Sequence, residues 1–168
     1  MRQYFLSGCC AYALTLFAGA ASLAQAQTTS SASMGVSLQV TAQCSVNSVN
    51  AMNFGTQDIS GGSVDHAASF ELNCTRSTPF TVGIDAGAGA GATSSARKMT
   101  GAASGQTISY QLYMDEAHTR NWGNDASQSL AGTGSGGNQS FTVYARVPEQ
   151  AAPAPDSYTD NVTLSVTY

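Results

Sequence analysis

The sequence has 168 residues, of which 10% are charged, and its formal net charge is −4. This length suits one domain of ordinary size and hardly two, and the lack of a basic cluster argues against nucleic acid as a partner. The chain is not expected to be disordered, because its apolar residues follow a regular pattern.

The first 26 residues predict a secretory signal peptide. Arg2 supplies a positive charge, residues 6–23 form an apolar run, and Ala24-Gln25-Ala26 is a typical cleavage site. We therefore expect export, with cleavage before Gln27. A transmembrane anchor is the alternative, but the apolar run is short and is interrupted by small residues.

Removal of this leader would leave two cysteines, Cys44 and Cys74. Two thiols in an exported chain normally pair, so we expect one disulfide. A metal site is the alternative. It is disfavoured because neither cysteine lies in a CxxC motif and because His66 and His118 lack ligand spacing.

Alternating apolar and polar residues predict a series of short strands. From Met34 to Cys44 the alternation predicts one long strand or two short strands run together. Further strands are expected around residues 68–74, 79–84, 108–112, 141–147 and 157–168, with a short one near Ser129 and Leu130. The connections between them are rich in glycine, serine or proline, namely residues 56–65, 85–96, 115–137 and 148–155.

This pattern predicts an all-β protein. Six or seven short strands, with no helical period outside the leader, favour a β-sandwich. A closed barrel is the alternative, but the connections are long and uneven.

The terminal stretch is the most regular of these predicted strands. Val162, Leu164, Val166 and Tyr168 fall on one side of it, and polar residues fall on the other. Such a strand needs a pairing partner on each edge and a cover for its apolar face, or it becomes an aggregation site. The sequence therefore raises the question of which chain supplies them.

The sequence offers little that resembles a catalytic site. Its acidic residues are scattered, so capping of turns is favoured over a pair of catalytic carboxylates; these residues are Asp85, Asp115, Glu116, Asp125 and Asp160. The glycine-rich residues 85–96 lack the Gly-Lys-Ser/Thr ending of a phosphate-binding loop. We therefore predict no enzyme activity, no cofactor, no metal and no small-molecule substrate.

One group of aromatic residues allows a second kind of site. Trp122 with Tyr113 and Tyr144 would make a platform for stacking a sugar. Packing within the protein is favoured for aromatic residues of a small β-protein.

Several short motifs occur in a fixed order along the chain. They are Asn53-Phe54-Gly55, Leu72-Asn73-Cys74-Thr75, Arg97-Lys98-Met99, Tyr110-x-Leu112-Tyr113-x-Asp115, Trp122-Gly123, Thr142-Val143-Tyr144, Arg146-Val147-Pro148 and Tyr158-x-Asp160-x-Val162-x-Leu164-x-Val166. From about Val36 to Tyr168 the chain resembles the spore coat protein U domain, a family shared with subunits of archaic chaperone–usher pili. Ala145 and Asp156 depart from it, because the family usually has glycine there, and Asp156 puts the turn before the last strand in question.

The resemblance implies an immunoglobulin-like sandwich that lacks its final strand. In such proteins a periplasmic chaperone lends a strand first, and the N-terminal segment of the next subunit replaces it at an outer-membrane usher. We accordingly expect a donor segment at residues 27–37 and a sandwich at residues 38–168. Groove-filling side chains are expected at Met34, Val36 and Leu38, although the boundary between donor and first strand is open.

The acceptor strand, which the chaperone would also contact, is expected to carry Val162, Leu164, Val166 and Tyr168, with the chaperone anchoring the carboxylate of Tyr168. The leading hypothesis is therefore a non-catalytic pilus subunit, exported to the periplasm and then displayed on the cell surface. Its partners would be the chaperone, the usher and neighbouring subunits. Two alternatives are a self-contained coat protein whose N-terminal segment folds back, and a carbohydrate-binding adhesive domain that uses Trp122 and residues 115–137.

Overall fold

The computed structural model describes residues 25–151 and 153–168. Most of the predicted signal peptide, residues 1–24, lies outside these described residues. The chain divides into two units, one that ends at Leu38 and one that spans Gln39–Tyr168. Within the described ranges no helix is long and apolar enough to cross a membrane.

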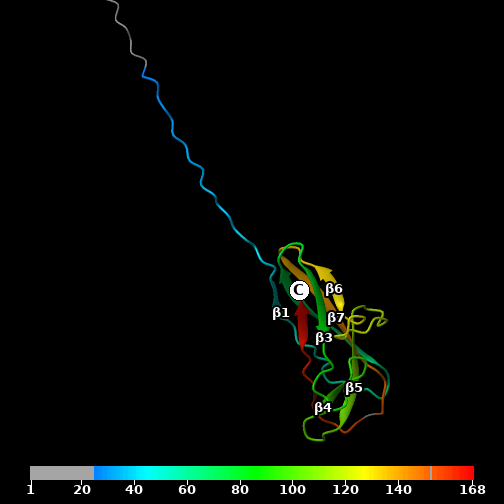
Figure 1. The fold of residues 1–168 in the computed structure, drawn as a ribbon. Coiled ribbons are helices and arrows are strands. Elements are labelled where there is room, and N and C mark those ends of the chain that lie inside the picture. Colours follow the sequence, from blue (N-terminus) through cyan, green and yellow to red (C-terminus); the bar gives the residue numbers. More distant parts are fainter. Residues whose placement is uncertain (1–24, 152) are drawn as a thin grey trace, which may run out of the picture. The chain divides into compact units, whose positions relative to one another are not determined.

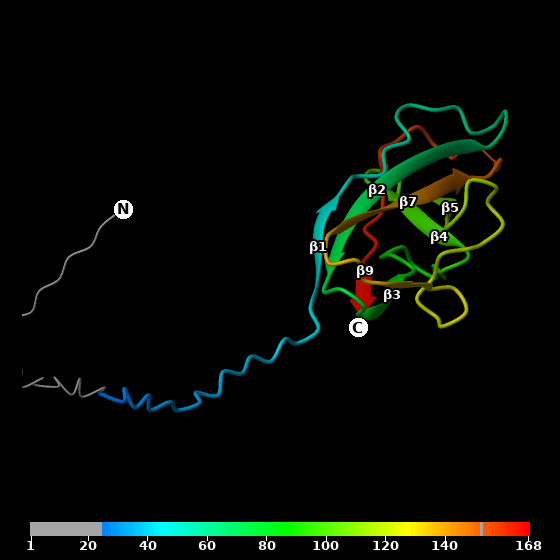
Figure 2. The same cartoon turned by 90° about the horizontal axis from the view of Figure 1, so that it is seen from above.

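The second unit is built from antiparallel strands (Figure 1). They are β1 (Cys44–Val49), β2 (Val64–Cys74), β3 (Pro79–Ile84), β4 (Arg97–Gly101), β5 (Thr107–Tyr113), β6 (Leu130–Thr133), β7 (Asn138–Val147), β8 (Tyr158–Thr159) and β9 (Leu164–Thr167). The larger sheet has the order β1-β2-β7-β5-β4-β8, and the smaller sheet has the order β6-β3-β9. Figure 2 shows that β2 and β7 curve together along the larger sheet. The all-β prediction is confirmed.

The core lies between these two sheets and follows the predicted alternation. Phe70 and Leu72 on β2 and Val82 on β3 are all buried, with exposed fractions of 0–1%. An edge-to-face contact between Phe80 of β3 and Phe141 of β7, with ring centroids 6.1 Å apart, joins the two layers. Strands that bury every second side chain therefore form the sandwich that the sequence predicts.

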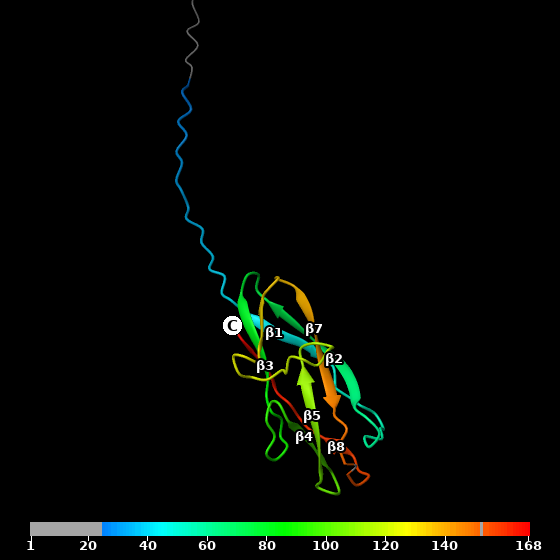
Figure 3. The ribbon, with the colours of Figure 1, turned by 90° about the vertical axis from the view of Figure 1, so that its right-hand side faces the viewer.

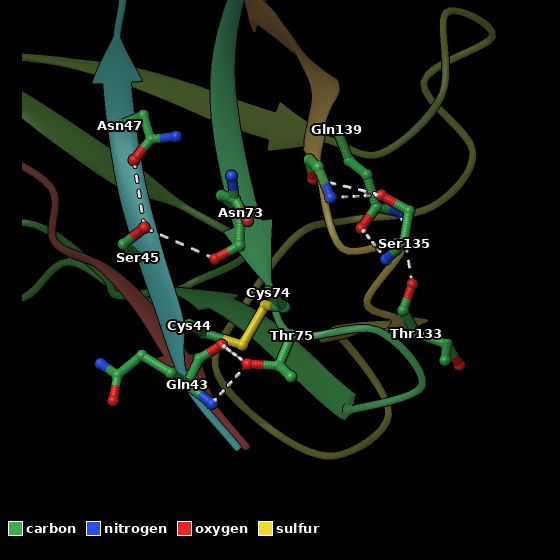
Figure 4. Close-up of a disulfide and its surroundings, with 11 residues drawn as sticks. Gln43, Cys44, Ser45, Asn47, Asn73, Cys74, Thr75, Thr133, Ser135 and Gln139 are labelled. Atoms are coloured by element: carbon green, nitrogen blue, oxygen red, sulfur yellow. Dashed lines mark hydrogen bonds between the residues drawn. A yellow bond between two sulfur atoms is a disulfide. The ribbon is translucent and has the colours of Figure 1, made fainter. Parts of the chain in front are cut away.

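The predicted disulfide is also confirmed, and a metal at these cysteines is excluded. Cys44 pairs with Cys74 across the β1–β2 ladder, and their sulfur atoms are bonded. The ladder continues past the disulfide, where the amide of Thr75 donates to the carbonyl of Gln43 at 2.9 Å. Figure 4 shows that the hydroxyl of Thr75 also bonds to the amide and the carbonyl of Gln43. The two cysteines are separated by 30 positions in the sequence. A disulfide that closes a loop of this length stabilises the fold by about 3–4 kcal/mol in the chain-entropy model.

Three strand predictions were wrong. Residues 34–43 form no strand, because an alternating segment has no ladder without a neighbouring strand to pair with. The terminal stretch is not one strand but two, β8 in the larger sheet and β9 in the smaller sheet. The sequence also did not predict β4, which begins at a buried arginine, Arg97.

Candidate functional site: a groove between two free strand edges

Two strands of the sandwich have an unpaired edge that borders the same groove. Among residues 25–151 and 153–168, β1 pairs with β2 alone and β9 pairs with β3 alone. In Figure 1 the red β9 lies between β3 and β1, and Figure 3 shows the chain passing from β8 at one end of the molecule toward the C-terminus. The free edges expose backbone amide and carbonyl groups that have no ladder partner.

The groove has a volume of about 970 Å³ and an apolar floor. Side chains of both sheets form this floor, namely Phe70, Ile84, Ile108, Tyr110, Leu112, Val143 and Val147. One wall is made by residues 49–57 and Ile59, and the other by residues 156–162 and Leu164. A hollow of this kind inside a small sandwich opens the core to solvent.

The register of β1 shows that part of its apolar face is uncovered. Val46 pairs with Leu72 and Val49 pairs with Phe70, and both partners are buried inner-face residues. Because paired residues of a ladder point to the same face of the sheet, Val46 and Val49 face inward too. They are nevertheless 41% and 64% exposed. The inner face of the sandwich therefore lacks a cover along β1.

The opposite wall of the groove also has apolar side chains that are incompletely covered. Leu164 and Val166 on β9 are half-buried and pack against the core, opposite Ile84 and Val82. Val162, just before β9, is 40% exposed, and Tyr168, just after it, is 53% exposed. Of the four predicted acceptor residues, Val162 and Leu164 line the groove, and Val166 and Tyr168 lie farther along the same segment. The apolar row of the four is incompletely covered.

The predicted donor residues are also exposed. Met34, Val36 and Leu38 have no secondary structure and are 86%, 91% and 89% exposed. They belong to the unit that ends at Leu38. In the described part of the chain the exposed large apolar side chains are confined to two places, the segment with Met34, Val36, Leu38 and Val40 and the groove edges with Val46, Val49, Val162 and Tyr168.

Three aspartates hold the wall formed by residues 156–163. Asp156 accepts hydrogen bonds from the amides of Ala103 and Ser104, at 2.9 and 2.7 Å. Asp160 accepts from the amide of Ala88 and from the phenol of Tyr110, both at 2.8 Å. These contacts tie the wall to the β4–β5 turn and to the glycine-rich loop.

The third aspartate, Asp85, acts from the end of β3. It accepts the amide of Thr163 at 2.9 Å and the amide of Gly87 at 3.0 Å. Partial burial raises the pKa of the Asp85 carboxyl, but these hydrogen bonds outweigh burial and hold its pKa below the ordinary value. Burial and the hydrogen bond to Asp160 raise the pKa of Tyr110 far above its ordinary value, so this phenol stays protonated and donates.

The contacts of Asp156 show how the turn before β8 is held with an aspartate at this position. The amides and hydroxyl around Ser104 lower the pKa of the Asp156 carboxyl to about 2. A carboxylate here thus stabilises the turn before β8 through side-chain contacts.

We expect an Asp156→Asn variant to lose part of the acid dependence of stability. A carboxyl whose folded pKa lies below its unfolded value near 3.9 stabilises the fold above pH 4, and that contribution disappears as the pH falls toward 2. Denaturant unfolding at pH 7 and at pH 2.5 measures this difference. The variant should be less stable than wild type at pH 7, and this deficit should be clearly smaller at pH 2.5. An equal deficit at both pH values would contradict it.

Sequence reasoning missed the structural role of Arg97. Its side chain is fully buried, and its guanidinium donates to four backbone carbonyls at 2.6–2.9 Å, those of Ile84, Asp85, Ser94 and Trp122. Burial lowers the pKa of Arg97 from its ordinary value, but arginine remains charged in proteins. The sequence shows only an arginine beside a glycine-rich loop. It does not indicate that four backbone carbonyls, which we call the carbonyl cradle, surround this side chain.

Trp122 packs within the protein, as the sequence favours, and the alternative of a sugar platform loses its central residue. Trp122 is 1% exposed and donates its indole N–H to the carbonyl of Val82 at 3.0 Å. Tyr113 and Tyr144 are a half-buried cross-strand pair of β5 and β7. His118 has a side chain that is only 9% exposed, and it contacts the ring of Tyr113 edge-on.

The comparisons with known proteins agree with this geometry. A family model described as the Spore Coat Protein U domain matches residues 30–165. A relative named Protein U, from Myxococcus xanthus, is 29% identical over 153 residues, which are 83% of this chain and 86% of the relative.

A solved structure shares the fold. It is a pre-assembly complex between the chaperone CsuC and the tip adhesion subunit CsuE, from the archaic chaperone–usher Csu pili of Acinetobacter baumannii. The TM-score is 0.58 at 17% identity, and the match covers 77% of this chain and 40% of that chain.

Proposed function

Because the chain belongs to the spore coat protein U domain family, we propose that it is a structural subunit of a chaperone–usher surface fibre that polymerises by donor-strand complementation. The family is structural and non-enzymatic, and the fold is that of a pilus subunit. In this proposal the segment around Met34, Val36 and Leu38 of one copy fills the groove of the next copy. The adhesive alternative loses its support with the burial of Trp122.

One observation carries the proposal. The large apolar side chains that are exposed within the described residues form two sets, one on an extended segment and one along two free strand edges. The first set alternates with a period of two, as the side chains of an inserted strand must. Two members of the second set, Val49 and Val162, line a groove with an apolar floor. The apolar side chains of the extended segment are therefore what the groove lacks, and the groove is what would bury them.

The energetics of such a junction are favourable. Burial of Met34, Val36 and Leu38 would contribute roughly 5–9 kcal/mol at 1.5–3 kcal/mol for each side chain. The backbone of the strand would add ladder hydrogen bonds on both free edges. Ordering of the segment and loss of independent motion oppose these gains, so two ladders and several buried side chains are needed together.

A periplasmic chaperone is the partner that we propose for the free subunit. An exported copy with an open groove exposes apolar side chains and two strand edges, which is a risk of aggregation. A chaperone strand laid in the groove would cover both, and the carboxylate of Tyr168 at the end of the acceptor segment is the group it would anchor. An outer-membrane usher would then exchange this strand for the donor segment of the next copy, and the fibre would form at the cell surface.

A double variant, Val36→Cys with Val49→Cys, tests the proposal directly. Both side chains are exposed, one on the proposed donor and one facing into the groove. We expect oxidation to give a ladder of covalent multimers on a non-reducing gel, because donor and acceptor come from different copies. The matched control pairs Val36→Cys with Ser127→Cys, which is exposed but outside the groove.

The outcomes separate the two structural hypotheses. Cross-linked monomers alone would indicate that the segment folds back into its own sandwich, as in a self-contained coat protein. If neither product forms with Val49→Cys or with Val46→Cys, the segment does not enter this groove, and the proposal fails.

A further inference from the structure

The connection between β1 and β2 occupies one end of the groove. Residues 50–63, which we name the groove flap, supply most of one wall. Met52, Phe54 and Ile59 of the flap are half-buried and pack against the core. Figure 2 shows the flap as the long teal connection at one end of β2. Part of the apolar floor therefore already has a cover that belongs to the same chain.

Hydrogen bonds do not fix this flap to the body of the domain. The last bond along its N-terminal side joins the amide of Asn50 to the carbonyl of Ser69 at 2.9 Å. For residues 51–63, all within the described chain, the recorded hydrogen bonds are internal, such as that from the amide of Gly55 to Asn53 Oδ1 at 2.8 Å. Only apolar side chains and the two chain connections hold the flap in place.

Phe54 of the flap lies against the inner side of β2. His66 pairs with the buried Ala145, and it shares the inner side of β2 with Phe70 by alternation, yet it is exposed. The ring of Phe54 lies against it, with centroids 6.0 Å apart. The side chain of Phe54 thus sits over the sheet where a further strand would place its own apolar residues.

We propose that the groove flap regulates strand entry: it covers one end of the empty groove, and an incoming strand must detach Met52, Phe54 and Ile59 before it can seat completely. This inference rests on the proposed function, because it concerns the same groove. The strand can replace the flap because it brings ladder hydrogen bonds that the flap lacks. The flap therefore sets the rate of the last step of insertion.

The test measures the rate of strand uptake by flap variants. A fluorescein-labelled peptide with the sequence of residues 27–40 is mixed in excess with the exported chain, and anisotropy gives the association rate. We expect Phe54→Ser to take up the peptide about tenfold faster than wild type, because a half-buried phenylalanine no longer has to be detached. Ser63→Thr, at an exposed flap position that does not line the groove, is the control and should leave the rate unchanged.

A second variant serves if Phe54→Ser does not fold. Phe54→Trp is conservative, and the native Trp122 is buried, so acrylamide quenching reports on the introduced indole. Quenching should increase when the peptide binds, because the flap leaves the core. Unchanged quenching, or equal uptake rates for Phe54→Ser and wild type, would overturn the flap proposal and leave the fibre proposal standing. If no variant and no wild-type chain binds the peptide, both proposals fail.

Discussion

Val36→Asp is expected to abolish fibre formation while leaving the sandwich folded. Val36 is 91% exposed, so the substitution costs the free domain almost nothing. In the groove of the next copy the same carboxylate would be buried without a partner, at a cost of about 3–5 kcal/mol, which weakens each junction by at least a hundredfold. Electron microscopy of the cell surface and the size of heat-released multimers measure the result.

Ser37→Asp is the matched control for this prediction. It introduces the same charge one residue away, where alternation directs the side chain out of the groove, and fibres should persist. Deletion of residues 27–36 should also stop polymerisation, and the deleted subunit should still be recovered with its chaperone. Normal fibres from the deletion or from Val36→Asp would show that this segment is not the donor.

Arg97→Met should destabilise the domain by about 3–5 kcal/mol. The methionine fills much of the volume but leaves four carbonyl oxygens without their donor inside the protein, and each unsatisfied group costs about 1–3 kcal/mol before relaxation. The loss should be large because these carbonyls lie on three separate segments, around Ile84, Ser94 and Trp122. Denaturant unfolding at pH 7 measures the change in free energy.

Lys98→Met controls for the loss of one positive charge on the same strand. Its ammonium group donates only a 3.3 Å bond to the carbonyl of Ala90 and is partly exposed. This variant should change the free energy of unfolding by less than about 1 kcal/mol. If Arg97→Met also falls within that range, solvent or a rearranged loop satisfies the four carbonyls, and the cradle is not essential.

The alternating strands could be predicted because their pattern is local. Phe70, Leu72 and Cys74 bury every second side chain of β2, as the sequence indicates, and the same holds for β5 and β7. The disulfide followed from the number of cysteines and the expected export. Residues 34–43 show the limit of this reasoning, because the pattern of a strand does not reveal whether the chain itself provides a partner.

The end of the chain could not be predicted, for a different reason. The amide of Thr163 donates to Asp85 and the amide of Asn161 donates to Asp160, so carboxylates replace ladder partners between β8 and β9. The bond from Thr163 joins residues 78 positions apart, and the bond from Asn161 joins neighbours, so neither leaves a periodic trace in the sequence. Arg97 is similar, because backbone carbonyls from distant segments stabilise it and a sequence does not display where carbonyls gather.

The position of the disulfide has a mechanical consequence for a fibre joined in the proposed way. Tension along the fibre would reach each copy through the segment before Cys44, at the first residue of β1. Hydrogen bonds pulled from the end of an edge strand would otherwise break one after another. The covalent link to Cys74 passes the load directly to β2, which is held on its far side by ten consecutive residue pairs with β7. Under tension, a fibre joined in this way would therefore separate at the junctions between subunits before any subunit unfolded.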